Sequence, residues 1–166
     1  MLGKLFNNPV FRDNRGNFER IFDRSVLGLK NHHILQANLS INPQKYTLRG
    51  MHFQVSGPEE IKMVVVLSGE VQVVLSNAHL RQKNVELQNE YHILSHESHQ
   101  TLVVPSGLAT GWLSLSENAI LLYLMTARFE DCSYGGFRFD DRLANINWLH
   151  NPAIISSKDL NWQPIT

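Results

Sequence analysis

The fold of this chain is decided by residues 62–76, which read Lys-Met-Val-Val-Val-Leu-Ser-Gly-Glu-Val-Gln-Val-Val-Leu-Ser. Two apolar runs rich in valine, Val64–Leu67 and Val71–Leu75, flank the turn residues Ser68–Glu70. Such β-branched runs favour strands, and a short glycine-containing connection between two of them is typical of a β-hairpin. The segment therefore predicts a hairpin over Lys62–Leu75.

Short runs of the same character continue on both sides of this segment, separated by turns such as Val104–Gly107. Strands that recur about every 8–12 residues, with little helical periodicity between them, are typical of an all-β sandwich or barrel. Short helices are expected only near Arg24–Lys30 and at Ser156–Leu160. The predicted strands are residues 34–40, 62–68, 71–76, 100–104, 111–116 and 119–126.

Length and composition restrict the class of protein. A chain of 166 residues has the size of one domain, and we assign residues 1–166 to a single domain. The 15 Lys and Arg residues balance the 15 Asp and Glu residues, so no nucleic-acid partner is expected. No apolar run approaches the roughly 20 residues that span a bilayer, so no membrane partner is expected either. Cys132 is the only cysteine, which excludes an internal disulfide and agrees with a cytoplasmic protein.

A candidate catalytic residue precedes the valine-rich segment, in Leu48–Gln54, which reads Leu-Arg-Gly-Met-His-Phe-Gln. Strict strand alternation places Arg49, Met51 and Phe53 on one face and His52 on the other. An imidazole inside a β-barrel can act as a general base, because its unperturbed pKa is about 6.5. A histidine in such a place can also be a core residue whose nitrogen atoms are satisfied by a neighbour. His52 alone does not decide between these interpretations.

A series of short motifs, taken together, resembles the dTDP-4-dehydrorhamnose 3,5-epimerase family. Each motif is weak alone, but all of them occur in the family's order and spacing, from about Asp13 to Pro164. The motifs are Asp13–Glu19, Gln36–Ser40, Leu48–Gln54, Lys62, Gly69–Val71, Val104–Ala109, Phe137–Asp141, Asn145–Trp148 and Ser157–Asp159. The resemblance implies a cupin-type antiparallel jelly roll with a few short helices. It also implies a homodimer that exchanges amino-terminal strands, and a nucleotide-diphosphate sugar with a 4-keto group as substrate.

The resemblance further implies roles for individual residues in removing a proton from C3 or C5, next to the ketone. His52 matches the family's base, and Asp159 matches the carboxylate that pairs with it. Lys62 and Arg49 match the cations near the substrate's carbonyl and diphosphate. Positions that contact the nucleotide or sugar, some of them in a neighbouring subunit, are matched by Arg15, Phe18, Glu19, Gln36, Asn38 and Gln54.

The chain departs from the family at the acid that opposes the base. The gapless alignment places Phe129 where the family has a tyrosine, and phenylalanine keeps the ring but has no proton to donate. Thr110 replaces a family histidine, and residues 73–79 lack the two carboxylates and the arginine of the family's motif. If the alignment is shifted near Phe129, Tyr134 or Tyr123 supplies a phenol instead.

These departures predict a variant family member with reduced or restricted activity. It is an epimerase acting at one carbon, an epimerase of a different 4-keto sugar nucleotide, or an enzyme that removes a proton and returns it to the same face. In such an enzyme, exchange with solvent outpaces inversion, and Phe129→Tyr raises the ratio of inversion to exchange. The alternative is a protein that binds a nucleotide sugar without converting it. The presence of both His52 and Asp159 argues against that alternative, because a binding protein has little use for a base and its carboxylate.

Metal binding is the other common use of a cupin barrel. Such sites employ two histidines two residues apart, a glutamate and a later histidine. Here Gln54 stands in place of the second histidine and Thr110 in place of the last one. His96 and His99 lie in a polar loop that is expected to form a solvated turn. No metal and no other cofactor is therefore expected.

Overall fold

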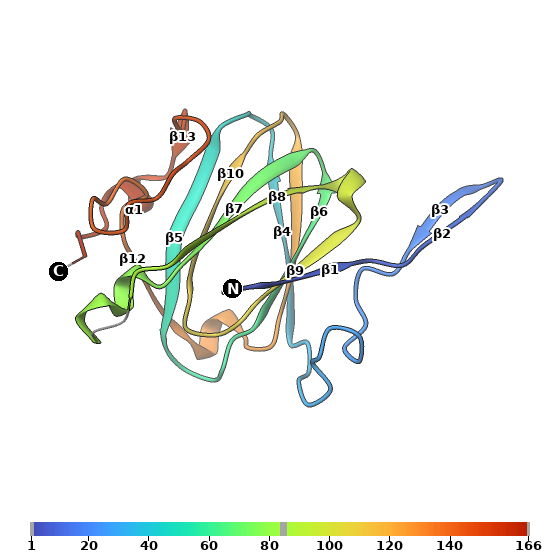
Figure 1. Ribbon diagram of the computed structural model, residues 1–166, viewed down its shortest axis with the longest axis horizontal. Helices are drawn as coiled ribbons and strands as arrows, with labels where there is room; N and C mark the ends of the chain where they lie inside the picture. The colour runs from blue at the N-terminus through green and yellow to red at the C-terminus, as the bar shows by residue number, and fades with distance from the viewer. Residues whose placement is uncertain (1, 84–85, 166) are drawn as a thin grey trace.

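The computed structural model of the protein describes residues 2–83 and 86–165, and its main strands form two sheets that pack face to face (Figure 1). One sheet, the β6 sheet, has the strand order β1-β9-β6-β11-β4. The other, the β5 sheet, has the order β12-β5-β10-β7-β8, and β13 pairs in parallel with β5. The remaining pairings in both sheets are antiparallel.

The β6 sheet contains β1 (Lys4–Asn7), β4 (Gln36–Asn42), β6 (Lys62–Ser68), β9 (Gln100–Val104) and β11 (Ala119–Met125). The β5 sheet contains β5 (Thr47–Ser56), β7 (Glu70–Ser76), β8 (Asn89–Ser95), β10 (Ala109–Ser114), β12 (Ser133–Gly136) and β13 (Ile154–Ile155). A separate pair of strands is formed by β2 (Val10–Asp13) and β3 (Gly16–Glu19). The helical segments are α1 (Ser157–Leu160) and the 3-10 turns η1 (Ala78–Lys83), η2 (His96–Ser98) and η3 (Phe129–Asp131).

The connections between these strands confirm the predicted jelly roll. From β4 to β7, and again from β8 to β12, the chain changes sheet at every connection. The predicted strands agree with β4, β6, β7, β9, β10 and β11 to within two residues. None of the helical segments in the described part of the chain is long and apolar enough to cross a bilayer.

The predicted hairpin over Lys62–Leu75 is wrong, although both of its strands exist. β6 pairs with β9 and β11, whereas β7 pairs with β8 and β10 in the opposite sheet. Gly69 lies at the corner between the sheets with φ +74°, and a Cβ there would collide with the hydroxyl of Ser116. Both strands are buried along most of their length, and an apolar run without alternation does not indicate which strand it pairs with.

The predicted helix near Arg24–Lys30 is also wrong, since the chain forms successive turns there. The amide of Leu29 donates to the carbonyl of Arg24, a spacing wider than that of an α-helix. Gly28 lies in the left-handed region with φ +75°, which ends any helical turn. Leu27 and Leu29 are nevertheless buried against the outer face of the β6 sheet. The predicted helix at the carboxyl end is present as α1.

Apolar side chains form three layers around the two sheets. The central layer lies between the sheets and includes Val64, Val73 and Trp112. A second layer joins the outer face of the β5 sheet to the carboxyl-terminal segment, through Met51 and Phe137. The third covers part of the outer face of the β6 sheet, with Leu27, Leu29, Ile61, Met63 and Val103. The carboxyl-terminal segment is thus packed firmly on the β5 sheet, which allows it to contribute side chains to a site.

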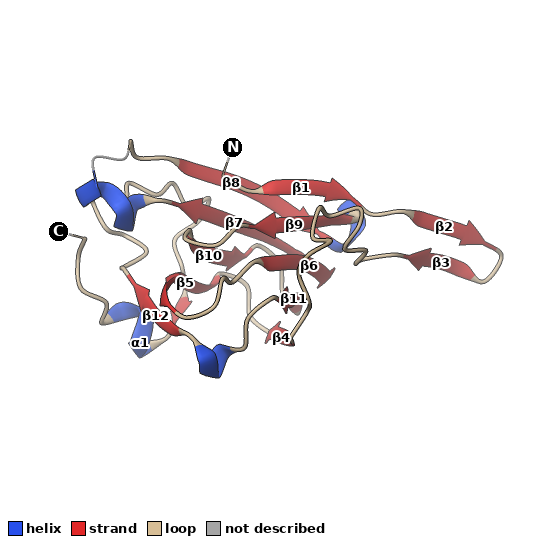
Figure 2. Ribbon diagram, turned by 90° about the horizontal axis from the view of Figure 1, so that it is seen from below, coloured by secondary structure: helices blue, strands red, loops and turns tan. Residues whose placement is uncertain are grey.

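The β2–β3 hairpin, residues 10–19, projects away from the two sheets in both ribbon views (Figures 1 and 2). We call it the arm. Its base is attached to the barrel, because the backbone amide of Asn8 donates a hydrogen bond to the His99 carbonyl at a distance of 2.7 Å. Beyond that base, Phe11 and Phe18 are 53% and 66% exposed. Two exposed phenylalanines on a projecting hairpin indicate a surface that is suited to a partner.

Candidate active site

A cavity of about 520 Å³ lies between the two sheets, toward the end that the carboxyl-terminal segment covers. Its volume is within the range that small-molecule ligands occupy. The β5 sheet contributes polar and aromatic side chains, the β6 sheet contributes a mixed wall, and the carboxyl-terminal segment closes one side. The β5-sheet wall includes Arg49, His52, Thr110, Trp112 and Tyr134. The β6-sheet wall includes Asn38, Lys62, Val64, Tyr123 and Met125. The carboxyl-terminal segment contributes Ser156, Lys158, Asp159 and Trp162.

His52 and Asp159 form a hydrogen-bonded pair in this cavity. His52 Nε2 lies 2.6 Å from Asp159 Oδ1, and the Asp159 side chain is 4% exposed. Burial alone would raise the pKa of the Asp159 carboxyl, but the hydrogen bond to His52 and its charge hold that pKa below the ordinary value. The pair therefore presents an ionised carboxylate to one imidazole nitrogen. Such a carboxylate orients the ring and stabilises the imidazolium that forms when the ring takes up a proton.

Asp159 is held in place by its own helix and by β5. The Ser156 hydroxyl caps α1 by accepting a hydrogen bond from the Asp159 amide, at 3.1 Å. The second carboxylate oxygen, Oδ2, accepts a hydrogen bond from the Gly50 amide at 3.2 Å. β13 pairs with β5 immediately before the helix and fixes where α1 begins. Three separate elements thus position one carboxylate.

The face on which Arg49 lies differs from the prediction. Arg49 pairs with Trp112, and His52 pairs with Thr110, so that two residues of β5 oppose the single Gly111 of β10. This β-bulge reverses the alternation, and Arg49 lines the cavity together with His52. Met51 lies instead in the apolar layer outside the sheet. Strict alternation fails here because it assumes a regular ladder along the whole strand.

The bulge brings a cation and a base onto one wall. The guanidinium carbon of Arg49 lies 5.7 Å from the centre of the Trp112 ring, and Arg49 Nε donates to Asn42 Oδ1 at 3.2 Å. Gly50 permits the close approach of the two strands, because a Cβ there would lie 2.5 Å from Gly111 Cα. Its φ of +128° also excludes other residues.

Lys62 faces His52 across the cavity but is not a free cation. Its Nζ lies 2.8 Å from Glu60 Oε1, and the Glu60 side chain is 3% exposed. The other carboxylate oxygen of Glu60, Oε2, accepts a hydrogen bond from the Tyr134 hydroxyl. Lys62 Nζ also lies 5.8 Å from the centre of the Tyr134 ring. We call Glu60, Lys62 and Tyr134 the phenol cluster.

Phe129 lies at the rim of the same cavity, as the resemblance implies. It is 53% exposed, and its ring stacks on Tyr134 with the ring centres 4.9 Å apart and the planes 11° from parallel. Its backbone amide donates to Gln36 Oε1 at 2.6 Å, and Gln36 in turn donates to Asn38. Asn38 lines the cavity, whereas Gln36 supports the wall behind it.

Gln54 does not line this cavity. Its side chain bonds to the loop that precedes β6, donating to the Pro58 carbonyl at 2.6 Å and accepting from the Glu60 amide at 3.2 Å. Gln54 therefore orders the loop that carries Glu60.

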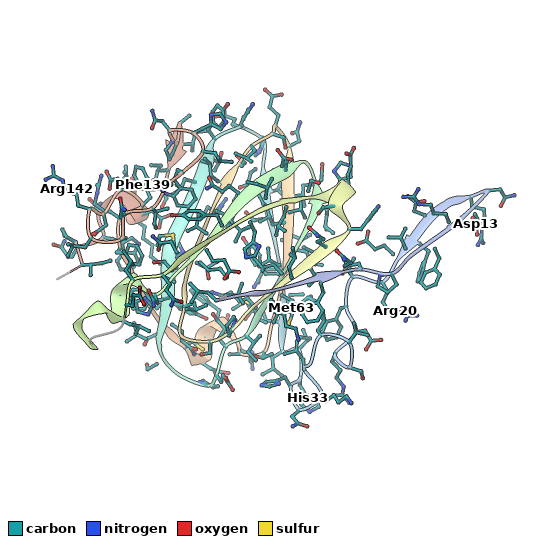
Figure 3. All side chains as sticks on the ribbon, in the orientation of Figure 1. Asp13, Arg20, His33, Met63, Phe139 and Arg142 are labelled. Carbon is teal, nitrogen blue, oxygen red and sulfur yellow. The ribbon has the colours of Figure 1, made fainter. Side chains whose placement is uncertain are left out.

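The predicted arm residues lie far from the cavity of their own chain. Arg15 pairs with Asp13 at 2.6 Å, and Figure 3 places Asp13 at the far tip of the arm, opposite the end that carries Phe139 and Arg142. Glu19 accepts from the Asn8 side chain and contacts His99 Nδ1 at 2.9 Å, at the base of the arm. None of the predicted arm residues lines the cavity of its own chain.

Glu60 is the site residue that sequence reasoning missed. A glutamate just before an apolar strand looks like an exposed loop residue, and such residues are almost never buried unless they are paired. The sequence feature that could have indicated the burial of Glu60 is its spacing from Lys62, since residues two apart on an extended segment lie on the same face. Among the described residues, no group of three or more His, Cys, Asp or Glu side chains is placed to hold a metal ion.

The arrangement is suited to proton transfer at a carbon next to a carbonyl group. A histidine with a buried carboxylate can take up a proton, and cations can stabilise the negative oxygen that results. The cavity also has a second ionisable cluster, in which Tyr134 of the β5 sheet meets Glu60 and Lys62 of the β6 side. The site therefore has the parts for an enolate reaction.

Comparisons with known proteins point to the same chemistry. A family model described as dTDP-4-dehydrorhamnose 3,5-epimerase matches residues 3–166. The dTDP-4-dehydrorhamnose 3,5-epimerase of Methanothermobacter thermautotrophicus is 32% identical over 172 residues, which cover 98% of this chain and 90% of that protein.

Two solved structures have the same fold over nearly the whole chain. The Bacillus anthracis dTDP-4-dehydrorhamnose 3,5-epimerase with TDP and PPi bound has a TM-score of 0.85 and 28% identity, covering 98% of this chain and 93% of that one. The Legionella pneumophila dTDP-6-deoxy-D-glucose-3,5-epimerase in complex with dTDP-4-keto-L-rhamnose has a TM-score of 0.85 and 28% identity, covering 98% and 87%. With a matching family model over residues 3–166, the chain belongs to the dTDP-4-dehydrorhamnose 3,5-epimerase family.

Proposed function

We propose that this protein is an epimerase of a nucleotide-linked 4-keto-6-deoxy sugar, which removes a proton at C3, at C5 or at both. The observation that carries the proposal is the His52–Asp159 pair, with 2.6 Å between Nε2 and Oδ1 inside the cavity. His52 is the base. Asp159 holds the ring and balances the positive charge that the ring gains on taking up the substrate's proton.

The cations on the other walls complete the first half of the reaction. When the C–H bond next to the ketone breaks, its electron pair moves onto the 4-keto oxygen and forms an enolate. Lys62 faces His52 and stabilises that oxygen, and Arg49 binds the diphosphate. An apolar floor that includes Val64 and Trp112 excludes water and strengthens both interactions.

The related epimerases are named for dTDP-linked sugars, and we propose the same nucleotide here. The experiment uses dTDP-4-keto-6-deoxyglucose in D₂O. Deuterium entering at C3 or C5, followed by mass spectrometry and proton NMR, supports the proposed function. Binding of the nucleotide sugar without deuterium uptake would leave only a binding protein.

That binding protein is the second candidate, and Phe129 is the observation that favours it. A ring without a hydroxyl lies at the position of the family's acid, so reprotonation from the opposite face lacks its usual donor. The two candidates differ in the deuterium experiment, because a binding protein catalyses no exchange.

We also propose that two copies of the chain assemble so that each arm contacts the partner's cavity. The arm exposes Phe18 and carries Arg15 and Glu19 away from its own cavity. The outer face of the β6 sheet is partly uncovered, with Leu39 and Ile41 59% and 61% exposed. A second copy accounts for both exposed surfaces.

Co-expression of two inactive variants tests this arrangement. An Arg15→Ala chain has an intact base, and a His52→Asn chain has an intact arm. If arms act in the partner's site, random pairing of the two chains restores about a quarter of the wild-type rate, because half the dimers carry one complete site. No restoration of activity, in particles shown to be mixed dimers, would place the arm's action within its own chain.

We place the reaction in the cytoplasm, in agreement with a single cysteine that has no internal partner.

A further inference from the structure

We propose that Tyr134 donates the proton that completes inversion, from the side of the cavity where Glu60 and Lys62 lie and in place of the phenol that Phe129 lacks. This inference rests on the proposed function and deepens it. The observation behind it is the phenol cluster, in which the Tyr134 hydroxyl, the Glu60 carboxylate and the Lys62 ammonium meet at the wall of the cavity.

The base and the phenol come from neighbouring strands of the β5 sheet, but their polar ends are held by different parts of the chain. His52 is held by Asp159, which the carboxyl-terminal helix α1 supplies. Tyr134 lies on β12 beside Gln54, and its hydroxyl is held by Glu60, from the segment that leads into β6 of the other sheet. A sugar ring between these two anchors presents one face to the imidazole and the other to the phenol.

The surroundings keep the phenol protonated, as a proton donor must be. Burial and the neighbouring Glu60 carboxylate raise the pKa of the Tyr134 hydroxyl above its ordinary value. The charge of Glu60 is balanced by Lys62, whose ammonium lies 2.8 Å from Glu60 Oε1. The same ammonium lies 5.8 Å from the Tyr134 ring and is the nearby cation for the tyrosinate that remains after donation.

The proton balance of the step is simple. The enolate's electron pair forms the new C–H bond as the Tyr134 O–H bond breaks, and its electrons stay on the phenol oxygen. His52 leaves the step as imidazolium, carrying the proton from the original face. Tyr134 is only half-buried, so solvent returns a proton to the tyrosinate while His52 loses its own. No other reactant is needed.

The other phenylalanine and tyrosine side chains that line the cavity, Phe129 and Tyr123, fit this role less well. Phe129 has no proton to donate, although it stacks on Tyr134 and holds that ring in a fixed plane. Tyr123 has a phenol and lies on β11, where its backbone pairs with Asn38 and Val64. Its hydroxyl takes part in none of the hydrogen bonds described for the phenol cluster.

The experiment compares inversion with deuterium exchange on dTDP-4-keto-6-deoxyglucose in D₂O. His52 can still remove a proton and return a deuteron to the same face in Tyr134→Phe, so exchange continues. Inversion needs the opposite donor, and we expect the ratio of inversion to exchange to fall by at least about tenfold, since a positioned acid commonly contributes 10²–10⁴-fold. Tyr91→Phe is the matched variant, because Tyr91 lies on β8 and does not line the cavity, and its ratio is expected to stay at the wild-type value.

Glu60→Gln provides a second test, in which the pH dependence of the ratio of inversion to exchange is measured. A purely structural role of Tyr134 would not change that pH dependence. The amide oxygen still accepts the phenol's hydrogen bond, but the negative charge that raises the phenol's pKa is gone. We expect the ratio of inversion to exchange to decline as pH approaches about 10, the ordinary value for tyrosine, whereas the wild-type ratio stays level.

The outcomes separate this inference from the proposed function. Wild-type protein that neither exchanges nor inverts overturns both. Wild-type exchange with an unchanged ratio in Tyr134→Phe overturns the Tyr134 assignment alone. A proportional loss of exchange and inversion in Tyr134→Phe, or a level ratio in Glu60→Gln, makes Tyr134 a positioning residue and likewise rejects it as the donor.

Discussion

The side chains of His52 and Asp159, which are 107 residues apart in the sequence, meet with 2.6 Å between Nε2 and Oδ1. One partner comes from the middle of β5 and the other from the short helix near the carboxyl end. The base is therefore oriented only when the carboxyl-terminal segment has packed on the β5 sheet. Formation of the His52–Asp159 pair therefore depends on the packing of the carboxyl-terminal segment.

We predict that His52→Asn lowers the rate of deuterium exchange at the substrate carbon by at least about 10²-fold, the usual effect of losing a positioned base. The asparagine cannot take up the proton. His92→Asn is the control, because His92 also pairs with a carboxylate, 2.7 Å from Glu90, but lies on β8 outside the cavity. Its exchange rate should match the wild type. Persistent exchange in His52→Asn would assign the base to another residue.

We predict that Asp159→Asn destabilises the protein by about 1–3 kcal/mol at pH 5 and above, as expected for losing a buried hydrogen bond to a charged group. The pKa of Asp159 is lowered in the folded protein, so its contribution is present above the unfolded value of about 3.9 and disappears as pH falls through the folded value. Urea unfolding of both proteins from pH 3 to pH 7 measures this. A difference that increases toward pH 3 would contradict the prediction.

We predict that Gly50→Ala costs more than about 2 kcal/mol of unfolding free energy, because it combines an unfavourable φ with a steric clash. The added Cβ would lie 2.5 Å from Gly111 Cα and 3.0 Å from the Thr110 carbonyl oxygen. Gly28→Ala is the matched change: φ is +75°, and no atom lies within 4 Å of the added Cβ. Gly28→Ala should cost about 1–2 kcal/mol of unfolding free energy, from the unfavourable φ alone. Equal losses in the two variants would show that the clash is relieved.

We predict that Phe129→Tyr leaves the ratio of inversion to exchange near the wild-type value. The sequence alone leads to another expectation, a gain of roughly tenfold, or about 1.4 kcal/mol of barrier, from a restored acid. The two expectations differ because Tyr134 already supplies a phenol beside Phe129, with ring centres 4.9 Å apart. NMR of the product mixture in D₂O distinguishes them. A tenfold gain would return the donor's position to residue 129.

Most of the fold could be predicted because many of the strand segments are rich in β-branched residues. The valine-rich runs became β6 and β7, and the jelly roll is confirmed. Their pairing could not be predicted, since the choice between a hairpin and a corner depends on which strands come from elsewhere in the chain. The turns at 24–30 had helical composition in part, but their leucines are satisfied by packing on the β6 sheet instead.

The residues of the candidate site that belong to sequence motifs could be predicted. Those that reach the site only through contacts between distant parts of the chain could not. His52, Asp159 and Lys62 line one cavity, as the motifs implied. The burial of Glu60 could be predicted only in part, because its spacing from Lys62 is a local signal but its other partner, Tyr134, lies 74 residues away on another strand. The roles of all these residues stay predictions until exchange is measured.

The bulge between Arg49 and His52 has a consequence for any attempt to redesign this enzyme. Before the bulge Arg49 lines the cavity, and after it His52 does, although the two residues are three positions apart, so the strand changes phase within the site. Point substitutions on either side leave that phase intact. Deleting or inserting one residue there would turn either the guanidinium or the imidazole to the outside of the barrel. The length of this stretch is therefore under stricter constraint than the chemistry of most side chains around it.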